Sequence, residues 1–409
     1  MSDSGLNLLM ISRCPPYPLH LGDRLIPYYL VRELAARGVQ VDLLAYTQPP
    51  FDPADEHHYA PLFRQITHVP EPARPPASLL ARALLPGRRF PTRREDSWSP
   101  AMWDAIARAL AERRYDAVHL FGGVQVYEFL ALVGHLPNLI VPYESYSLLL
   151  ERMLAQAASP LARAQIRAQL VMARHYERWM FRGYDRTVVV SDRDAATLRN
   201  LAPDLRVAVI PNGVDLAAYR PTGRKADRPT LIFTGNYEYG PNLDAAQVLL
   251  REIFPAVRAA VPDAELLIVG NNPPPELQAL AGNGVTITGR VPAVEPYLDA
   301  AHVYVCPLRI GAGIKNKVLA AMAMGTPVIG TRLSFDGIAV SDGQDVIMAD
   351  SPAAISRETI RLLSDPARRA TLAANARQRI EAQYTWQAVA DRYLALYRAI
   401  IEEHERTER

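Results

Sequence analysis

The sequence predicts an α/β protein made of two Rossmann-like domains that face a central cleft. A chain of 409 residues is too long for one ordinary hydrophobic core. Its beginning has the pattern strand, loop, helix, strand at 6–12, 13–24, 25–36 and 39–45, which is the opening of a doubly wound sheet. The same alternation starts again at Leu231.

A polar segment separates the two halves. Residues 221–229, PTGRKADRP, carry proline at both ends, which is typical of an interdomain linker. We therefore place the domain boundary between residues 220 and 221.

The composition narrows the functional classes. With 49% hydrophobic and 22% charged residues, the chain is expected to fold as an ordinary soluble protein. A net charge of +2 argues against a general nucleic-acid binder. Cys14 and Cys306 lie far apart, and no metal framework can be built from them. The beginning does not read as a signal peptide, and no apolar run approaches about 20 residues, so we expect a cytoplasmic protein.

Candidate ligand-binding residues of the first half lie where its predicted strands end. Gly22, Asp23 and Arg24 follow the first strand, and ligands of doubly wound sheets bind at the carboxyl ends of strands. The loop lacks the GxGxxG spacing, so a nicotinamide dinucleotide is not expected. His119 and Glu144 belong to later strand ends in the same half. The alternative for His119 is a core residue with its hydrogen bonds satisfied, which is about as common for a single histidine in a strand as a ligand-binding position.

The segment 71–96 interrupts the alternating pattern. Prolines and arginines flank four leucines: Arg88, Arg89, Arg93 and Arg94 around Leu79, Leu80, Leu84 and Leu85. One interpretation is peripheral contact with anionic lipid at the inner membrane face, near a lipid-linked acceptor. The alternative is an ordinary amphipathic helix with a solvated arginine rim.

The stretch 308–330, LRIGAGIKNKVLAAMAMGTPVIG, is the most informative part of the second half. A strand at 303–307 leads into a loop with Gly311 and Gly313, and a helix is predicted to begin near Ile314. A glycine loop followed by a helix N-terminus is a recurring anion site, because free N–H groups and the positive helix end face the ligand.

Three positive charges surround this loop. Arg309 precedes it, and Lys315 and Lys317 belong to the first helical turn. We interpret the stretch as a diphosphate site. The alternative is that both lysines are solvated surface residues and the glycines only make a tight connection.

Several segments, in order along nearly the whole chain, resemble glycosyltransferase family 4 on a GT-B fold. They are the loop Pro15–Pro16 to Gly22–Asp23, then VVS at 189–191, IPNGVD at 210–215, FTG at 233–235, LIVG at 267–270, ITGRV at 287–291, and VL to PV at 318–328. Each is weak alone, and the ordered set is specific. The nearest subgroup is bacterial sugar transferases with a GPN loop, here 240–242.

The resemblance implies a retaining, metal-independent glycosyltransferase of cell-envelope, exopolysaccharide or natural-product synthesis, with a nucleotide sugar as substrate and neither a metal nor a cofactor. The C-terminal domain, 221–385, would bind the nucleotide-sugar donor. The N-terminal domain, 1–220, would bind the acceptor, and the last helix, 386–409, would pack back on it. A front-side mechanism would let the leaving phosphate take the acceptor's proton.

The resemblance also assigns roles to individual residues. Lys317, Lys315, Glu144 and His119 would be catalytic, and Gly22, Arg24, His119 and Glu144 would face the acceptor. The donor site would comprise Gly22, Asp23, Gly235, Asn236, Asn242, Gly270, Arg290, Val291, Arg309, Gly311, Ala312, Gly313, Ile314, Lys315, Asn316, Lys317 and Ala320.

The chain departs from the family pattern at four of these positions. Ala312 and Ala320 stand where the family has glutamates, the second of which accepts hydrogen bonds from the donor ribose. Losing such a charged hydrogen bond costs on the order of 1.5–3 kcal/mol. Asn236 and Asn242 stand where the family has an arginine and a lysine, and Lys315, Lys317 and Arg309 are hypothesised to replace them.

Two other functions stay open. One is a GT-B-shaped binding or partner protein that has lost catalysis, which Ala320 favours. The other is a sugar-nucleotide epimerase, which would need an acid and a base; only Glu144 and Asp23 are candidates. The sequence does not identify the nucleotide, the sugar or the linkage.

Overall fold

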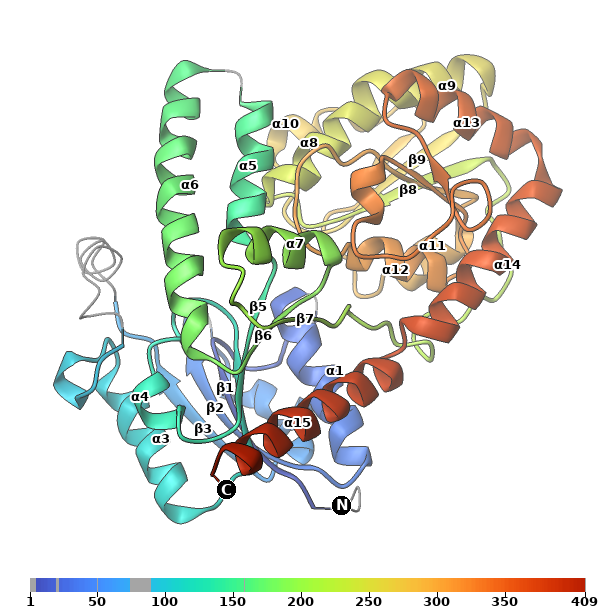
Figure 1. Ribbon diagram of the computed structural model, residues 1–409. Helices are drawn as coiled ribbons and strands as arrows, with labels where there is room; N and C mark the ends of the chain where they lie inside the picture. Colours follow the sequence, from blue (N-terminus) through green and yellow to red (C-terminus); the bar gives the residue numbers. More distant parts are fainter. Residues whose placement is uncertain (1–4, 20–21, 50, 74–89, 158, 409) are drawn as a thin grey trace. The chain divides into compact units, whose positions relative to one another are not determined.

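The computed structural model describes residues 5–19, 22–49, 51–73, 90–157 and 159–408 (Figure 1). The chain forms two compact units. The N-terminal unit comprises Met1–Ile210 and Trp386–Arg409, and the C-terminal unit comprises Pro211–Thr385. The division falls at Ile210, somewhat before the boundary that the polar segment 221–229 predicts. The part of 71–96 that carries the four leucines, with Arg88 and Arg89, lies outside the described residues.

A seven-stranded parallel sheet forms the centre of the N-terminal unit, in the order β3-β2-β1-β4-β5-β6-β7. Its central strands are buried along almost their whole length because helices cover both faces of the sheet. The strands of the sheet are β1 (Asn7–Ser12), β2 (Gln40–Thr47), β3 (Gln65–Pro70), β4 (Ala117–Phe121), β5 (Asn138–Tyr143), β6 (Arg186–Val189) and β7 (Val207–Val209).

Seven α-helices are described in this unit. They are α1 (Gly22–Ala36), α3 (Pro100–Glu112), α4 (Leu130–Val133), α5 (Tyr146–Gln156), α6 (Pro160–Met180), α7 (Asp192–Leu201) and α15 (Trp386–Glu408), with short 3₁₀ turns at Pro53–His58, Ala60–Leu62, Arg94–Asp96 and Phe181–Gly183. Serine caps set where several begin: Ser145 Oγ accepts a hydrogen bond from Leu148 N, and Ser191 Oγ from Asp194 N. Because α1 and α15 bury apolar residues in one core and α3 and α7 in another, each face of the sheet is covered.

The C-terminal unit has a six-stranded parallel sheet, in the order β10-β9-β8-β11-β12-β13. Its strands are β8 (Thr230–Thr234), β9 (Glu265–Val269), β10 (Val285–Ile287), β11 (Val303–Cys306), β12 (Val328–Gly330) and β13 (Ile347–Met348). Its helices are α8 (Gly240–Val248), α9 (Phe254–Ala260), α10 (Pro275–Gln278), α11 (Glu295–Ala300), α12 (Asn316–Ala323), α13 (Pro352–Ser364) and α14 (Pro366–Gln383), with a π-helical turn at Leu249–Ile253 and a 3₁₀ turn at Arg332–Phe335.

Both sheets have a topological switch point beside their first strand. β1 lies between β2 and β4, and β8 lies between β9 and β11. The chain leaves such a strand on one side and returns on the other, which opens a crevice at the carboxyl ends. Each unit therefore has one topologically defined place for a ligand.

Candidate functional site

The glycine loop of the C-terminal unit connects β11 to α12. Gly311 and Gly313 have φ angles of 137° and 64°, a region that side chains other than glycine rarely adopt. The Lys315 Nζ donates to the carbonyl oxygens of Ala312 and Gly313 at 2.8 and 2.6 Å. This buried ammonium therefore closes the loop on itself. The helix begins at Asn316, slightly later than the predicted start at Ile314.

Lys317 points across the switch point. Its ammonium donates to the side-chain oxygen of Asn242 and lies 4.8 Å from the centre of the Phe233 ring. Phe233 belongs to β8 and Asn242 to α8, whereas Lys317 belongs to α12. Loss of water around this half-buried ammonium lowers its pKa to about 8. Lys317 thus places a cation at the ligand edge of the sheet, held by an uncharged partner.

The residues after β8 and β9 form a close backbone contact. A side chain at Gly270 would put its Cβ 1.9 Å from the carbonyl oxygen of Gly235. The side-chain nitrogen Nδ2 of Asn242 donates to the backbone carbonyl oxygen of Asn236 at 2.8 Å. Asn242 therefore fixes the turn after β8 with its nitrogen and holds Lys317 with its oxygen.

The other predicted cations have different surroundings. Arg309 forms an ion pair with Asp244, with 3.0 Å between Nε and Oδ2. Arg290 is exposed in the turn after β10, and the neighbouring Val291 is half-buried. Of the three cations predicted around the glycine loop, Arg309 is neutralised and Lys315 is bound to carbonyls. Lys317 is the one of the three that reaches the switch point.

Ala312, Ile314 and Ala320 are buried beside Lys317, and Asn316 is half-buried. The side-chain oxygen of Asn316 accepts a hydrogen bond from Asn212 Nδ2 at 2.7 Å. This bond joins the beginning of the C-terminal unit to the first turn of α12. The methyl groups of the two alanines offer no hydrogen bond to a ligand.

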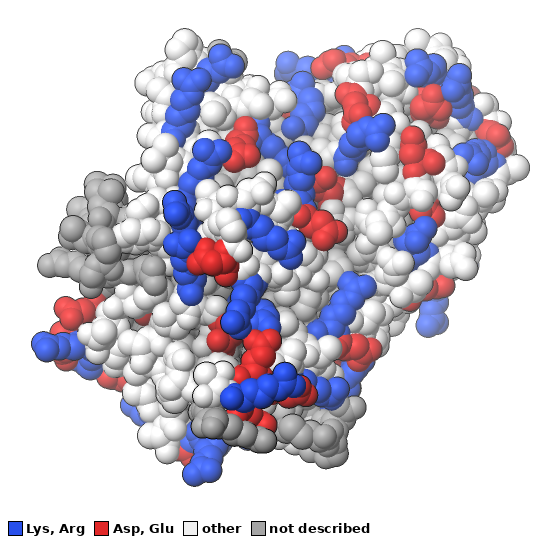
Figure 2. Space-filling view, in the orientation of Figure 1, with Lys and Arg blue, Asp and Glu red and all other residues white. Residues whose placement is uncertain are grey.

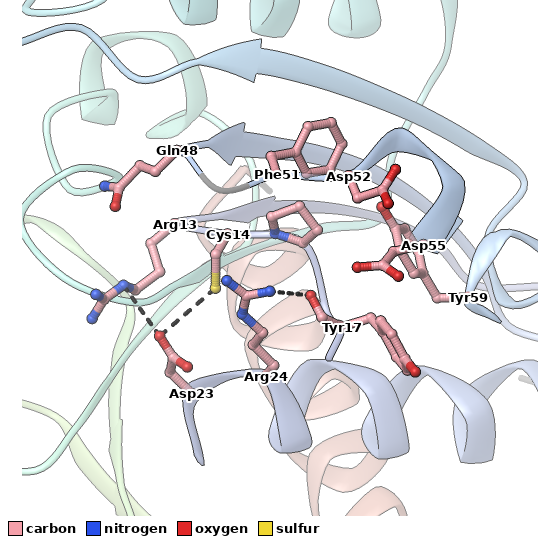
Figure 3. A pocket seen from close by; sticks show the side chains of 11 residues that line it. Arg13, Cys14, Tyr17, Asp23, Arg24, Gln48, Phe51, Asp52, Asp55 and Tyr59 are labelled. Atoms are coloured by element: carbon pink, nitrogen blue, oxygen red, sulfur yellow. Dashed lines mark hydrogen bonds and ion pairs between the residues drawn. The ribbon is translucent and has the colours of Figure 1, made fainter. Parts of the chain in front are cut away.

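The N-terminal unit contains a small cavity of about 70 Å³ at the ends of β1 and β2 (Figure 3). Figure 3 shows Arg13, Cys14 and Asp23 on one side and Asp52, Asp55 and Tyr59 on the other. Of its lining residues, only Asp23 and Arg24 were predicted from the sequence to bind a ligand. The lining residues that it did not name as ligand-binding are Arg13, Cys14, Pro15, Tyr17, Gln48, Phe51, Asp52, Asp55 and Tyr59.

Two arginines and three carboxylates give the cavity mixed charge. The Arg13 Nε lies 3.7 Å from Asp23 Oδ2. Arg24 donates from its Nη1 to the Tyr17 carbonyl, and its buried Nε has no hydrogen-bond partner among the described residues. Burial, together with the charge of Asp23, raises the pKa of the Cys14 thiol to about 12. Cys14 is therefore a neutral lining residue and not a nucleophile.

His119 lies in the core and not at a ligand-accessible strand end. It is fully buried, and its Nδ1 lies 2.6 Å from the hydroxyl oxygen of Tyr397 in α15. Burial lowers its pKa to about 3, so the ring is neutral. The side chain of residue 119 points toward α15, which contradicts an acceptor-facing or catalytic position and supports the core alternative.

Glu144 is half-buried directly after β5, and Gly22 begins α1. The neighbouring Tyr143 has a φ of 69° and donates from its hydroxyl to the Asp23 carbonyl at 3.2 Å. This bond brings the end of β5 beside the first turn of α1. Glu144 thus adjoins the predicted ligand side of the N-terminal sheet.

The scarcity of lysine marks three positions in the sequence, of which Lys317 is one. The chain has three lysines among 45 basic residues. Lys225 donates to the carbonyls of Asp299 and Ala301 at 2.8 and 2.9 Å, which resembles the role of Lys315. A chain that uses arginine almost everywhere has lysine where a compact ammonium is needed. No comparable signal marks Tyr17, Asp52 or Asp55, because only the fold brings their loop to β1.

Comparisons with known proteins agree with this architecture. The model of Glycosyltransferase Family 4 matches residues 27–218, and the model of Glycosyl transferases group 1 matches residues 228–365. The chain belongs to the family 4-like glycosyltransferases.

The chain spans about half the length of the curated relatives that it matches. The phosphatidyl-myo-inositol mannosyltransferase of Mycolicibacterium smegmatis is 29% identical over 47% of this chain and 51% of its own. A GDP-mannose-dependent monoacylated alpha-(1-6)-phosphatidylinositol monomannoside mannosyltransferase of Corynebacterium glutamicum is 31% identical over 45% of this chain and 54% of its own.

Solved structures confirm the GT-B class of two Rossmann-like domains. Sucrose-phosphate synthase from Thermosynechococcus elongatus has a TM-score of 0.73 at 22% identity, with 98% of this chain and 100% of that chain covered. WaaG, a glycosyltransferase involved in lipopolysaccharide biosynthesis, has a TM-score of 0.61 at 16% identity, with 94% and 98% covered. Within the described ranges, no cluster of three His, Cys, Asp or Glu could hold a metal, and no helix is long and apolar enough to cross a membrane.

Proposed function

We propose that this glycosyltransferase moves a sugar from a nucleoside diphosphate sugar to an acceptor of cell-envelope synthesis, with retention of configuration and without a metal. The observation that carries the proposal is the position of Lys317 beside the glycine loop. Perturbed cations at a switch point are candidates for anion binding. Because the relatives above are named mannosyltransferases, one of them GDP-mannose-dependent, GDP-mannose is the first donor to test.

In the proposed reaction, the bond between the anomeric carbon and the diphosphate oxygen breaks. The acceptor hydroxyl oxygen bonds to the same carbon from the same face, and its proton passes to the leaving phosphate. Negative charge grows on the diphosphate, where Lys317 and the free N–H groups at the start of α12 would stabilise it. His119, neutral and in the core, takes no part.

The cavity of the N-terminal unit is the proposed acceptor site. Asp52 and Asp55 can accept hydrogen bonds from hydroxyl groups, and the unpartnered Nε of Arg24 can donate one. Tyr17, whose ring stacks on His58 at 4.1 Å, adds an aromatic surface. Such a lining suits a polyhydroxylated acceptor group.

A second candidate is a binding protein without catalysis. Ala320 favours it, because its methyl group cannot accept hydrogen bonds from the donor ribose. Only the first candidate would form a product, which is the acceptor with the transferred sugar attached.

The test begins with calorimetric titration of GDP, UDP, dTDP, ADP and CMP. The proposal expects one nucleoside diphosphate to bind best and its sugar donor to support transfer to an extracted envelope lipid in the presence of EDTA. Binding without transfer to any envelope lipid or saccharide would favour the second candidate. Transfer that EDTA abolishes would refute metal independence, and an inverted anomeric product would refute retention.

A further inference from the structure

Helix α6 carries an exposed apolar face that the fold does not use. Its inward side is accounted for, because Ile166, Leu170 and Ala173 pack with Leu150 and Leu154 of α5. On the outward side, Leu161, Val171 and Met172 are 70%, 68% and 43% exposed. Monomeric surfaces rarely keep several large apolar side chains along one helix face without a partner.

A row of arginines borders this face. Four exposed arginines are spaced by four, seven and four residues, which puts them on one side of the helix: Arg163, Arg167, Arg174 and Arg178. From the first to the last, the row spans roughly 22 Å. Figure 2 shows basic side chains spaced along the region of α6, with uncharged surface and a few acidic side chains beside them.

Carboxylates are nearly absent from this surface. Glu177 is the only acidic residue of α6, and it points inward and is buried. Arg174 pairs with Glu151 of α5 at 2.8 Å. Asp204 pairs with Arg182 and lies close enough to Arg178 to interact with its charge. Among the described residues, no carboxylate forms an ion pair with Arg163 or Arg167. An apolar face with a one-sided basic border fits a surface that is both apolar and anionic.

We propose that α6 docks the N-terminal unit on an anionic lipid surface. Leu161, Val171 and Met172 would enter the boundary between headgroups and acyl chains, and the arginines would contact lipid phosphates. A second copy of this chain is the weaker occupant, because two such helices would bring identical arginine rows together. The site differs from segment 71–96, and it does not depend on the proposed function.

The test is co-sedimentation of the full chain with vesicles of phosphatidylglycerol and phosphatidylcholine, and with pure phosphatidylcholine. We expect binding to the anionic vesicles that weakens at high salt. Arg163→Glu/Arg167→Glu and, separately, Leu161→Glu/Val171→Glu should each lower partitioning about tenfold or more. Arg224→Glu/Arg251→Glu, two exposed positions of the C-terminal unit with the same change in charge, is the matched control.

Three results would overturn the proposal. They are no binding to anionic vesicles, equal loss in the control variant, or a dimer in solution that Leu161→Glu/Val171→Glu dissociates without any vesicle binding. The last result would make the face an interface between copies. Circular dichroism and nucleotide titration of each variant separate this outcome from misfolding and from failure of the donor site, since neither double substitution touches that site.

Discussion

At the scale of single residues, Lys317 carries the strongest functional argument. Lys315 and Lys317 are two positions apart, yet one ammonium closes a loop and the other faces the switch point. The difference follows from their places, because Lys315 precedes the helix and Lys317 lies in its first turn. Desolvation disfavours the charge of Lys317 in the free protein, and a bound diphosphate would favour it.

Lys317→Met should weaken binding of the preferred nucleoside diphosphate about ten- to a hundredfold, the cost of one charged hydrogen bond. The thermal midpoint of the free protein should not fall, because the substitution removes a desolvated charge. Titration calorimetry and thermal unfolding check the two effects. Arg224→Met is the control for loss of one positive charge. Equal affinity in Lys317→Met and the unchanged protein would contradict the role.

The pH dependence of binding gives an independent prediction. The pKa of Lys317 is lowered to about 8, so its ammonium is charged below that pH and loses its proton above it. Affinity for the diphosphate should therefore be full near pH 7 and fall as pH rises through 8, approaching about tenfold per pH unit. Lys317→Arg, whose guanidinium stays charged, should flatten the profile between pH 7 and 9.5. An equally steep fall in that variant would assign the effect to another group.

At the scale of elements, α15 completes the N-terminal core. Trp386 stacks on Tyr29 of α1 with ring centres 5.2 Å apart, and Tyr393 stacks on His119 of β4 at 5.6 Å. His119 thus links a central strand to the last helix through Tyr393 and Tyr397. Its polarity serves a buried hydrogen bond and not the reaction.

Tyr397→Phe should lower the free energy of unfolding by about 1–3 kcal/mol, because it leaves the buried Nδ1 of His119 without its partner. Nucleotide affinity should not change. Urea denaturation measures the first effect and calorimetry the second. Tyr146→Phe, at a position that is 52% exposed, is the matched control and should have little effect. Equal stability of the two variants would show that the His119–Tyr397 bond contributes nothing.

At the scale of the whole molecule, the chain crosses from one unit to the other twice, at Ile210 and again at Trp386. The N-terminal unit is therefore discontinuous in sequence, and the C-terminal unit is continuous. Since α15 supplies Val389, Tyr393 and Tyr397 to the core that α1 and β1 share, the N-terminal unit needs the end of the chain to bury its sheet.

Removal of residues 386–409 should therefore destabilise the N-terminal unit far more than the C-terminal unit. We expect the calorimetric transition of the N-terminal unit to shift down or disappear, while nucleotide binding persists. Differential scanning calorimetry with and without the nucleotide assigns the transitions. Removal of the short end 405–409 is the control. Loss of nucleotide binding on deletion of 386–409 would show that the C-terminal unit also depends on α15.

Local pattern was enough to predict most of the fold. Continuous apolar runs, helical spacing and glycine stops act over a few residues, so the β1–α1–β2 opening and the strands of the second unit could be located from sequence. Local pattern does not reveal the π-helical turn through which α8 and α9 meet, because its residues keep helical spacing. The glycine loop and its cations were also evident, because they are adjacent along the chain.

Which partner each side chain meets was decided by tertiary structure. Alternation along β4 could not tell whether His119 faces a ligand or a helix that begins hundreds of residues later. The cavity joins β1, α1 and the loop after β2, and Lys317 meets Asn242 only because β11 lies beside β8. The sequence by itself determined the two α/β units and the glycine loop with its lysines, since these depend on local propensity and spacing. Packing between distant segments decided which cation lies at the switch point of the C-terminal sheet, because long-range contacts leave no periodic signal in the sequence.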